Sequence, residues 1–188
     1  LIMPFGHDVL KYKELPFYLR FLSRYAIKRA QYITVDAEFV KEKVIDYFNY
    51  PSTRISVFPW GVDRNIFAPV REHSLRRKYN WEKNRIIIMN RGFQPRMDVK
   101  TLIKAIPSIV EKNPDARFLL LGASNIDDED SLWNSFENKL SKKSELECRR
   151  LVIELGIEKY VKFEGAVPNN DIGKYLAMSD LFVSTSLS

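Results

Sequence analysis

The sequence predicts an α/β protein with a doubly wound parallel sheet, and two observations support this prediction. Four short apolar runs, at residues 86–89, 116–121, 161–163 and 181–183, have the length of buried strands. Segments with helical periodicity separate these runs, and such alternation is typical of parallel sheets. Each run ends at a glycine, an arginine or a serine. Because ligands of doubly wound folds bind at the carboxyl ends of the strands, we expect a binding site there.

The clearest strand and helix pair covers residues 85–110. Its strand ends in a polar turn that carries Arg91 and Gly92, and apolar residues then recur at helical spacing up to Val110. A guanidinium beside the N-terminus of a helix suits a phosphate group, because the unpaired N–H groups there also attract anions. The alternative is that Arg91 is a loop arginine that solvates the turn.

Composition restricts the possible functions. The 188 residues make one large domain or one and a half small ones, and the net charge of +6 favours anionic partners such as nucleotides, acidic lipid surfaces or nucleic acid. The single cysteine, Cys148, excludes an internal disulfide and suits a reducing compartment such as the cytoplasm. Together with the two histidines, His7 and His73, this cysteine supplies too few ligands for a Cys/His zinc site. The missing G-x-G-x-x-G fingerprint argues against a nicotinamide or flavin cofactor.

The N-terminal third contains two features with open interpretations. Residues 1–3 resemble the end of a strand, and in the loop that follows, Gly6 and Asp8 either line a cleft or cap the next turn. Residues 16–31 predict a helix with aromatic side chains on one side and a basic stripe of Arg20, Arg24 and Lys28 on another. Such a helix either lies on an anionic membrane surface or packs with a solvated basic edge.

The next segments lead to a predicted link between two lobes. We expect strands at residues 32–35 and 54–58, with a helix at 37–48 that Asp36 caps. The turn after the second strand contains Gly61 and Asp63, which either face a cleft or belong to a plain connector with a buried Trp60. Further on, residues 71–83 predict a solvated helix, and residues 131–156 a long, interrupted helical region.

An acidic run gives the strongest argument for a metal, and it is a weak one. Paired carboxylates can hold magnesium between phosphates, and Asp127, Asp128, Glu129 and Asp130 form such a run. However, they stand before a helix, where acidic residues favour the dipole. We therefore expect no metal and no other cofactor.

The order of several motifs resembles the retaining glycosyltransferases of family 4, which have the GT-B fold of two Rossmann-like domains. The motifs are Phe58-Pro59-Trp60-Gly61-Val62-Asp63 with Phe67-Ala68-Pro69, Arg91 with Pro95 and Leu102-Ile103-Lys104-Ala105, Phe118-Leu119-Leu120-Leu121-Gly122, Val161-Lys162-Phe163-Glu164-Gly165, and Ser184-Thr185-Ser186. The resemblance implies that residues 1–64 are the end of the N-terminal, acceptor-side domain and its linker. Residues 65–188 would be the first part of the donor-binding domain.

The resemblance also implies roles for individual residues. Arg91 matches an arginine that grips the diphosphate of a nucleoside diphosphate sugar and stabilises it as a leaving group. A lysine of the family falls on Met97, with Arg96 beside it as a stand-in. The other residues on the donor side would be Gly92, Gly122, Gly165 and Ser186. The acceptor side would include Gly6, Asp8, Gly61 and Asp63, although the family's frequent histidine falls on Phe5.

The implied activity is transfer of a sugar to an acceptor hydroxyl with retention, in polysaccharide or glycolipid synthesis at the inner face of a membrane. The glutamate pair of the family would begin just after Ser188, so we expect this chain to be an inactive piece of an enzyme. The partners would be the donor, a glycan or lipid-linked acceptor, and a membrane surface at its periphery, but no nucleic acid. Two alternatives stay open, a non-catalytic sugar-nucleotide-binding module and a basic surface-binding domain.

Overall fold

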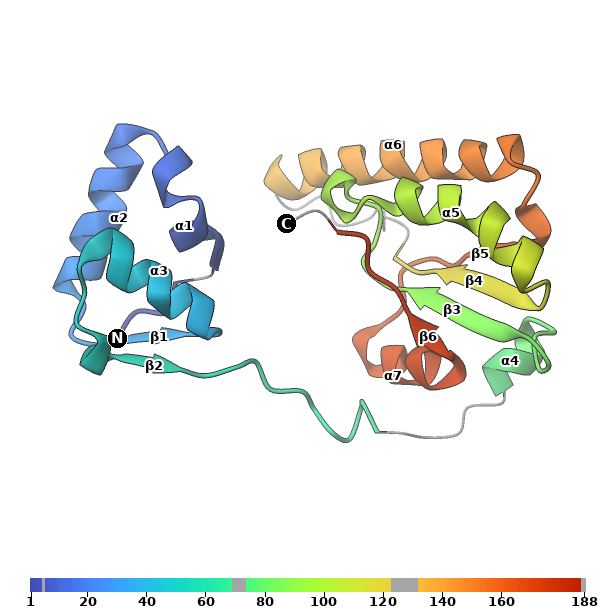
Figure 1. Cartoon of the computed structure of the whole chain (residues 1–188), viewed down its shortest axis with the longest axis horizontal. Helices are drawn as coiled ribbons and strands as arrows, with labels where there is room; N and C mark the ends of the chain where they lie inside the picture. The colour runs from blue at the N-terminus through green and yellow to red at the C-terminus, as the bar shows by residue number, and fades with distance from the viewer. Residues whose placement is uncertain (5, 69–73, 123–131, 187–188) are drawn as a thin grey trace. The chain divides into compact units, whose positions relative to one another are not determined.

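The computed structural model describes residues 1–4, 6–68, 74–122 and 132–186, which form two compact units. The first unit is Leu1–Val62 and the second is Asp63–Ser188 (Figure 1). The sequence predicts this division two residues later, between residues 64 and 65. Both units contain parallel strands joined through helices, so the predicted α/β class is confirmed.

The first unit has a small parallel sheet covered by α3 (Glu38–Phe48). Strand β1 (Ile33–Val35) pairs with β2 (Ile55–Val57), and Ile2 forms a parallel bridge to β1. Apolar residues of α3 recur at helical spacing and are buried with the inward side chains of both strands. The unit also contains α1 (Gly6–Leu10), α2 (Phe17–Arg29) and the 3₁₀ turns η1 (Tyr12–Glu14) and η2 (Ser52–Arg54).

Two predictions for this unit are wrong. Gly6 begins the short helix α1, where we had expected a loop. Asp36 does not cap α3, whose N-cap is Ala37 and has no side-chain bond, because the Asp36 Oδ2 accepts a hydrogen bond from the Trp60 indole at 3.2 Å. The error at Asp36 depends on a contact with a residue 24 positions away in the sequence. Of the two interpretations left open for the turn at Gly61 and Asp63, the connector with a buried Trp60 does not hold, because Trp60 is 64% exposed.

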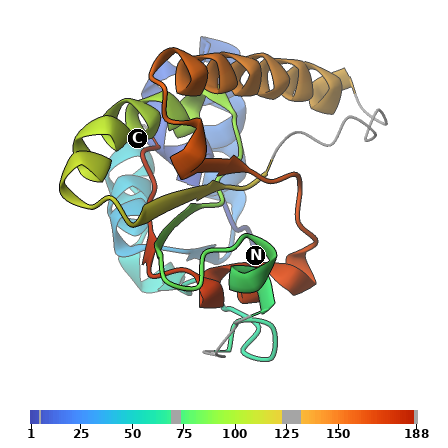
Figure 2. The ribbon, with the colours of Figure 1, turned by 90° about the vertical axis from the view of Figure 1, so that its right-hand side faces the viewer.

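The second unit is a doubly wound parallel sheet with strand order β5-β4-β3-β6. Its strands are β3 (Arg85–Met89), β4 (Ala116–Leu120), β5 (Val161–Phe163) and β6 (Leu181–Phe182). Helices α5 (Val99–Lys112) and α6 (Leu132–Glu154) lie on one face of the sheet, and α4 (Ser74–Lys78) and α7 (Asn169–Met178) on the other (Figure 2). The remaining turns are η3 (Pro95–Met97) and η4 (Glu158–Tyr160).

The alternation of side chains along β3 explains why both faces are covered. Ile87 and Met89 point into the core under α5 and α6, whereas Ile86 and Ile88 point into the core under α7. Successive side chains of a strand face opposite sides, so an unbroken apolar run requires two cores. This is the pattern from which the sheet was predicted.

Two helices of the second unit differ from their predicted extent. Helix α4 ends at Lys78, whereas the sequence predicts that the helical segment continues to residue 83. Asn80 follows it with a left-handed φ of 56°, which is typical of helix ends. Helix α6 runs without the predicted interruption. Among its described side chains, the buried ones are Ser141, Cys148 and Val152, while Leu155, predicted to face inward, is 38% exposed.

Candidate functional site

The carboxyl ends of β3, β4 and β5 meet in a row of glycines, which we call the glycine row: Gly92, Gly122 and Gly165. Gly92 and Gly122 have φ of +70° and +91°, a region that side chains disfavour. A methyl group added at Gly122 would lie only 2.9 Å from the Gly92 Cα. The Gly122 N–H donates a hydrogen bond to the Gly165 carbonyl at 3.3 Å. The structure therefore brings these three predicted residues together as a surface of bare backbone.

Two arginines stand in the loop that connects this row with α5. Arg91 precedes Gly92, and Arg96 lies in η3. Both are exposed, and within the part of the chain that the structure describes neither forms an ion pair. Met97 is 8% exposed and packs in the core beside Phe93. A side chain at position 97 thus points inward, and the cation available from this turn is Arg96.

The segment after β6 completes the same edge of the sheet. The Ser186 Oγ lies 3.0 Å from the Ser184 Oγ. Between them, the Thr185 hydroxyl donates to the carbonyls of Met97 and Asp98, at 3.0 and 2.9 Å. Ser186 is therefore held close to the turn that carries Arg96. From the sequence, Thr185 belongs to the Ser184-Thr185-Ser186 motif but receives no role, because nothing in the run of small polar residues distinguishes it from its neighbours.

The four residues predicted for the acceptor side belong to both units, with Gly6, Asp8 and Gly61 in the first and Asp63 in the second. Gly6 starts α1, and an added methyl group there would make only ordinary contacts, at 3.7 Å from Leu10 and Val40 side chains. Asp8 is in the same helix, with its side chain outside the described atoms. Gly61 has open space around it. Asp63 belongs to the second unit and accepts a hydrogen bond from the Asn65 N–H at 2.8 Å, so it shapes a turn.

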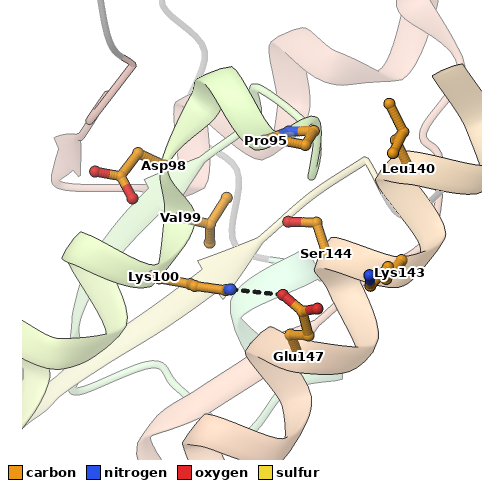
Figure 3. A pocket seen from close by; sticks show the side chains of 8 residues that line it. All are labelled: Pro95, Asp98, Val99, Lys100, Leu140, Lys143, Ser144 and Glu147. Atoms are coloured by element: carbon orange, nitrogen blue, oxygen red, sulfur yellow. Dashed lines mark hydrogen bonds and ion pairs between the residues drawn. The ribbon is translucent and has the colours of Figure 1, made fainter.

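A cavity of about 320 Å³ lies beside this edge, between the first turn of α5 and the middle of α6 (Figure 3). Lys100 and Glu147 point toward each other across it and form an ion pair of 2.5 Å. Their hydrogen bond raises the pKa of Lys100 and lowers the pKa of Glu147. Asp98 and Lys143 also line the cavity, so its charges balance. It is a poor candidate for an anionic ligand.

A second polar cluster joins α4 to the exit of β5, on the other face of the sheet. Lys78 forms a 3.1 Å ion pair with Glu164, which raises the pKa of Lys78. Burial, followed by hydrogen bonding to Glu164, raises the pKa of Tyr79 far above its usual range. Partial burial alone would raise the pKa of Glu164, but hydrogen bonds from Tyr79 and Lys78 outweigh it and lower this pKa. A carboxylate held in this way supports the fold and does not suit proton transfer.

The prediction that no metal is needed stays a prediction. Residues 127–130, the acidic run, lie outside the described residues. Across the ranges that the structure covers, no group of three or more His, Cys, Asp or Glu side chains is arranged to hold a metal ion.

The sequence is similar to those of known proteins. The family model "Glycosyl transferases group 1" matches residues 72–188. A GDP-mannose-dependent alpha-(1-6)-phosphatidylinositol monomannoside mannosyltransferase of Mycolicibacterium smegmatis is 23% identical over 184 residues, covering 94% of this chain and 41% of that protein. Mannosylfructose-phosphate synthase of Agrobacterium fabrum is 26% identical over 147 residues, covering 76% and 30%.

The fold has solved counterparts. The structure of Anabaena HepE in complex with UDP matches with a TM-score of 0.74 at 19% identity, over 97% of this chain and 46% of that one. Sucrose-phosphate synthase from Thermosynechococcus elongatus matches with a TM-score of 0.69 at 18% identity, over 98% and 43%. At these identities the likeness concerns the fold alone. The chain spans less than half the length of the relatives and structures that it matches.

Proposed function

Because the chain belongs to the glycosyl transferases group 1 family, we propose that its second unit binds the nucleoside diphosphate sugar of a glycosyltransferase. The observation that carries the proposal is the glycine row with Arg91 at its side. Bare backbone lets a diphosphate approach closely, and a guanidinium can hold phosphate oxygens with two parallel hydrogen bonds. The proposed donor ligands are Arg91, Gly92, Arg96, Gly122, Gly165 and Ser186.

Helix α5 adds to the attraction for a diphosphate. It has 14 residues and begins directly after the turn that carries Arg96. Its aligned peptide dipoles place positive potential at the N-terminus, where anions bind. The two arginines and the helix end therefore lie along the edge where parallel sheets bind their ligands.

The proposed chemistry depends on the leaving group. When the glycosidic bond to the donor breaks, negative charge develops on the departing diphosphate. A fixed cation in a site that excludes water stabilises that charge, and one such interaction is worth about 3 kcal/mol of the barrier. Arg91 is the proposed source. With the charge held by the protein, the reaction requires no metal.

More specifically, we propose that the protein is a retaining glycosyltransferase of family 4, which transfers the sugar to a hydroxyl of a glycan or glycolipid. The order of the motifs supports this assignment, and so does the similarity to an enzyme named for a phosphatidylinositol mannoside acceptor. The test uses a protein that contains this chain and has the full length of its relatives, which we call the longer protein. The anomeric configuration of its product is followed by NMR from the first turnover. Retention means that the first product has the configuration of the donor, and an inverted first product would refute the assignment.

Binding is tested by titrating the 188-residue chain with UDP, GDP and ADP in a calorimeter. We expect one of the diphosphates to bind, and the matching monophosphate to bind at least tenfold more weakly, because the arginines act on the diphosphate. Equal binding of monophosphate and diphosphate would contradict the proposed role of Arg91. Binding of the donor without transfer by the longer protein would instead favour a non-catalytic binding module.

We also infer a peripheral contact between α2 and an anionic membrane surface. Ile27 is the buried residue of this helix, while Phe17 and Phe21 are 78% and 69% exposed. Basic side chains surround the rings, and Phe21, Arg24, Tyr25, Lys28 and Arg29 line a shallow hollow of about 240 Å³. Exposed aromatic rings with cations suit the interface of a bilayer that contains anionic lipids. Among the described helices, none has the length and apolarity to cross a bilayer.

Vesicle sedimentation tests this contact. The chain should bind vesicles with 30% phosphatidylserine, at about physiological salt, more than vesicles of phosphatidylcholine alone. Replacement of Arg20, Arg24 and Lys28 by glutamine should abolish the difference. A control triple variant of Lys41, Lys43 and Lys104, which lie on other helices, should keep it. Equal binding of wild type and the α2 variant would refute the contact.

A further inference from the structure

Thr185 connects two segments that are far apart in the sequence. Its hydroxyl donates to the Met97 carbonyl at 3.0 Å and to the Asp98 carbonyl at 2.9 Å, across 88 and 87 positions of the chain. A hydroxyl has a single hydrogen, so the two carbonyls share it. The bond is partly buried and joins the segment after β6 to the turn before α5.

The turn that Thr185 holds has an unusual backbone. Asp98 adopts a left-handed conformation, with φ of 43° and ψ of 47°. Residues other than glycine enter this region at a cost, and they stay there when surrounding contacts fix them. Here the contacts include a 2.6 Å hydrogen bond from the Thr101 hydroxyl to the Asp98 carboxylate.

The fixed turn determines where Arg96 lies. Met97 is anchored in the core, and its N–H donates to the Gln94 carbonyl at 2.8 Å. Arg96, just before it, is exposed. Met97 is buried in the core, and Thr185 bonds to the carbonyls of Met97 and Asp98. We expect these contacts to restrain the backbone of Arg96 and the first N–H groups of α5. Groups held in place before the ligand arrives lose less entropy when it binds.

We propose that Thr185 is a positioning residue for the diphosphate, which acts by fixing Arg96 and the N-terminus of α5 against the segment that carries Ser186. This inference rests on the proposed function of the second unit. The hydroxyl hydrogen of Thr185 is engaged with backbone carbonyls, so it is not available to donate to the diphosphate. Its effect is on the geometry of the groups that make the contact.

The experiment compares Thr185→Val, which has nearly the same shape without the hydroxyl, with Thr185→Ser, which keeps it. The dissociation constants of UDP and GDP are measured by calorimetry on the 188-residue chain. We expect Thr185→Val to weaken the binding of the preferred nucleotide about tenfold, and Thr185→Ser to bind within about twofold of wild type. Ser108→Ala is the matched control, because it removes a hydroxyl-to-carbonyl bond of 2.9 Å at the far end of α5. It should bind normally.

A double variant separates positioning from general loss of structure. If Thr185 acts through Arg96, Thr185→Val should weaken binding much less when Arg96→Ala is already present. Urea unfolding of each variant gives the folded fraction, and Thr185→Ala replaces the valine variant if the latter does not fold. Normal binding by both hydroxyl-free variants overturns the inference, as does equal weakening by serine and valine. If the wild-type chain binds no nucleoside diphosphate, the proposed function fails first.

Discussion

In the four-stranded sheet, the amino ends of the strands form one edge (the amino edge) and the carboxyl ends form the opposite one (the carboxyl edge). The same residue types have different roles at these two edges. At the amino edge, Arg76 donates to the Met178 carbonyl, the Asn84 carbonyl and the Asp180 carboxylate, at 2.8, 3.1 and 2.9 Å. Asp180 also accepts the Ile86 N–H at 2.7 Å. At the carboxyl edge, the glycine row leaves backbone bare, and Arg91 stands exposed beside it.

This difference shows why charge alone does not identify a site. Arg85 begins β3 and pairs with Asp115 at 3.2 Å, while Arg91 follows the other end of the same strand and has no acidic partner among the described residues. A cation with a carboxylate beside it is compensated by the protein. One at a strand exit without such a partner remains available to an anionic ligand. The comparison predicts that the two edges respond differently to substitution.

The largest effect is expected for Arg91→Ala in the longer protein. Loss of the cation that stabilises the departing diphosphate should lower turnover at least ~100-fold, with little change in unfolding free energy because the side chain is exposed. Arg85→Ala, at the opposite end of the strand, is the matched control and should leave turnover nearly unchanged. Similar rates for both variants would remove Arg91 from the mechanism.

Gly122→Ala should have the next largest effect, now on stability. The added methyl group would meet the Gly92 backbone, and alanine disfavours the positive φ at this position. We expect a loss of about 2–3 kcal/mol in unfolding free energy, measured by urea denaturation. Gly61→Ala, in open space, should cost much less. Equal unfolding free energies for the two variants would contradict the close packing of Gly122 against Gly92.

Arg76→Ala tests the amino edge. It removes a partly buried guanidinium from three acceptors, so the unfolding free energy should fall by about 1–2 kcal/mol while nucleotide affinity stays unchanged. Arg77→Ala alters an exposed neighbour on α4 and should be nearly neutral. If the Arg76 variant were fully folded but bound nucleotide much more weakly, the amino edge would affect binding as well as stability. That result would contradict the different roles of the two edges.

The smallest expected effect is a dependence of stability on pH. The pKa of Glu164 is lowered in the folded state from its ordinary 4.5, so its contribution is complete above that pH and is lost as the pH falls through the lower folded value. Urea midpoints measured from pH 7 to pH 3 should therefore fall more for wild type than for Glu164→Gln. Parallel curves would show that Lys78 and Tyr79 do not stabilise the carboxylate.

Local patterns in the sequence predicted the sheet of the second unit and the strand exits, because an apolar run such as residues 86–89 needs no distant contact to be recognised. The features that they missed depend on pairs of distant residues. Thr185 binds carbonyls 87 and 88 positions away, and Asp36 bonds to Trp60 in place of its own helix. The packing of Gly122 against Gly92 likewise depends on strand pairing, although glycine at two neighbouring exits was a usable signal.

The most direct test is an NMR titration of the isotope-labelled chain with the nucleoside diphosphate that binds best. The amide signals of Gly92, Gly122 and Gly165 should shift together and saturate at the calorimetric affinity, while those of Arg85 and Ile86 stay in place. Saturable shifts centred on the amino edge or on the cavity between α5 and α6, with the three glycine signals unmoved, would contradict the proposed site.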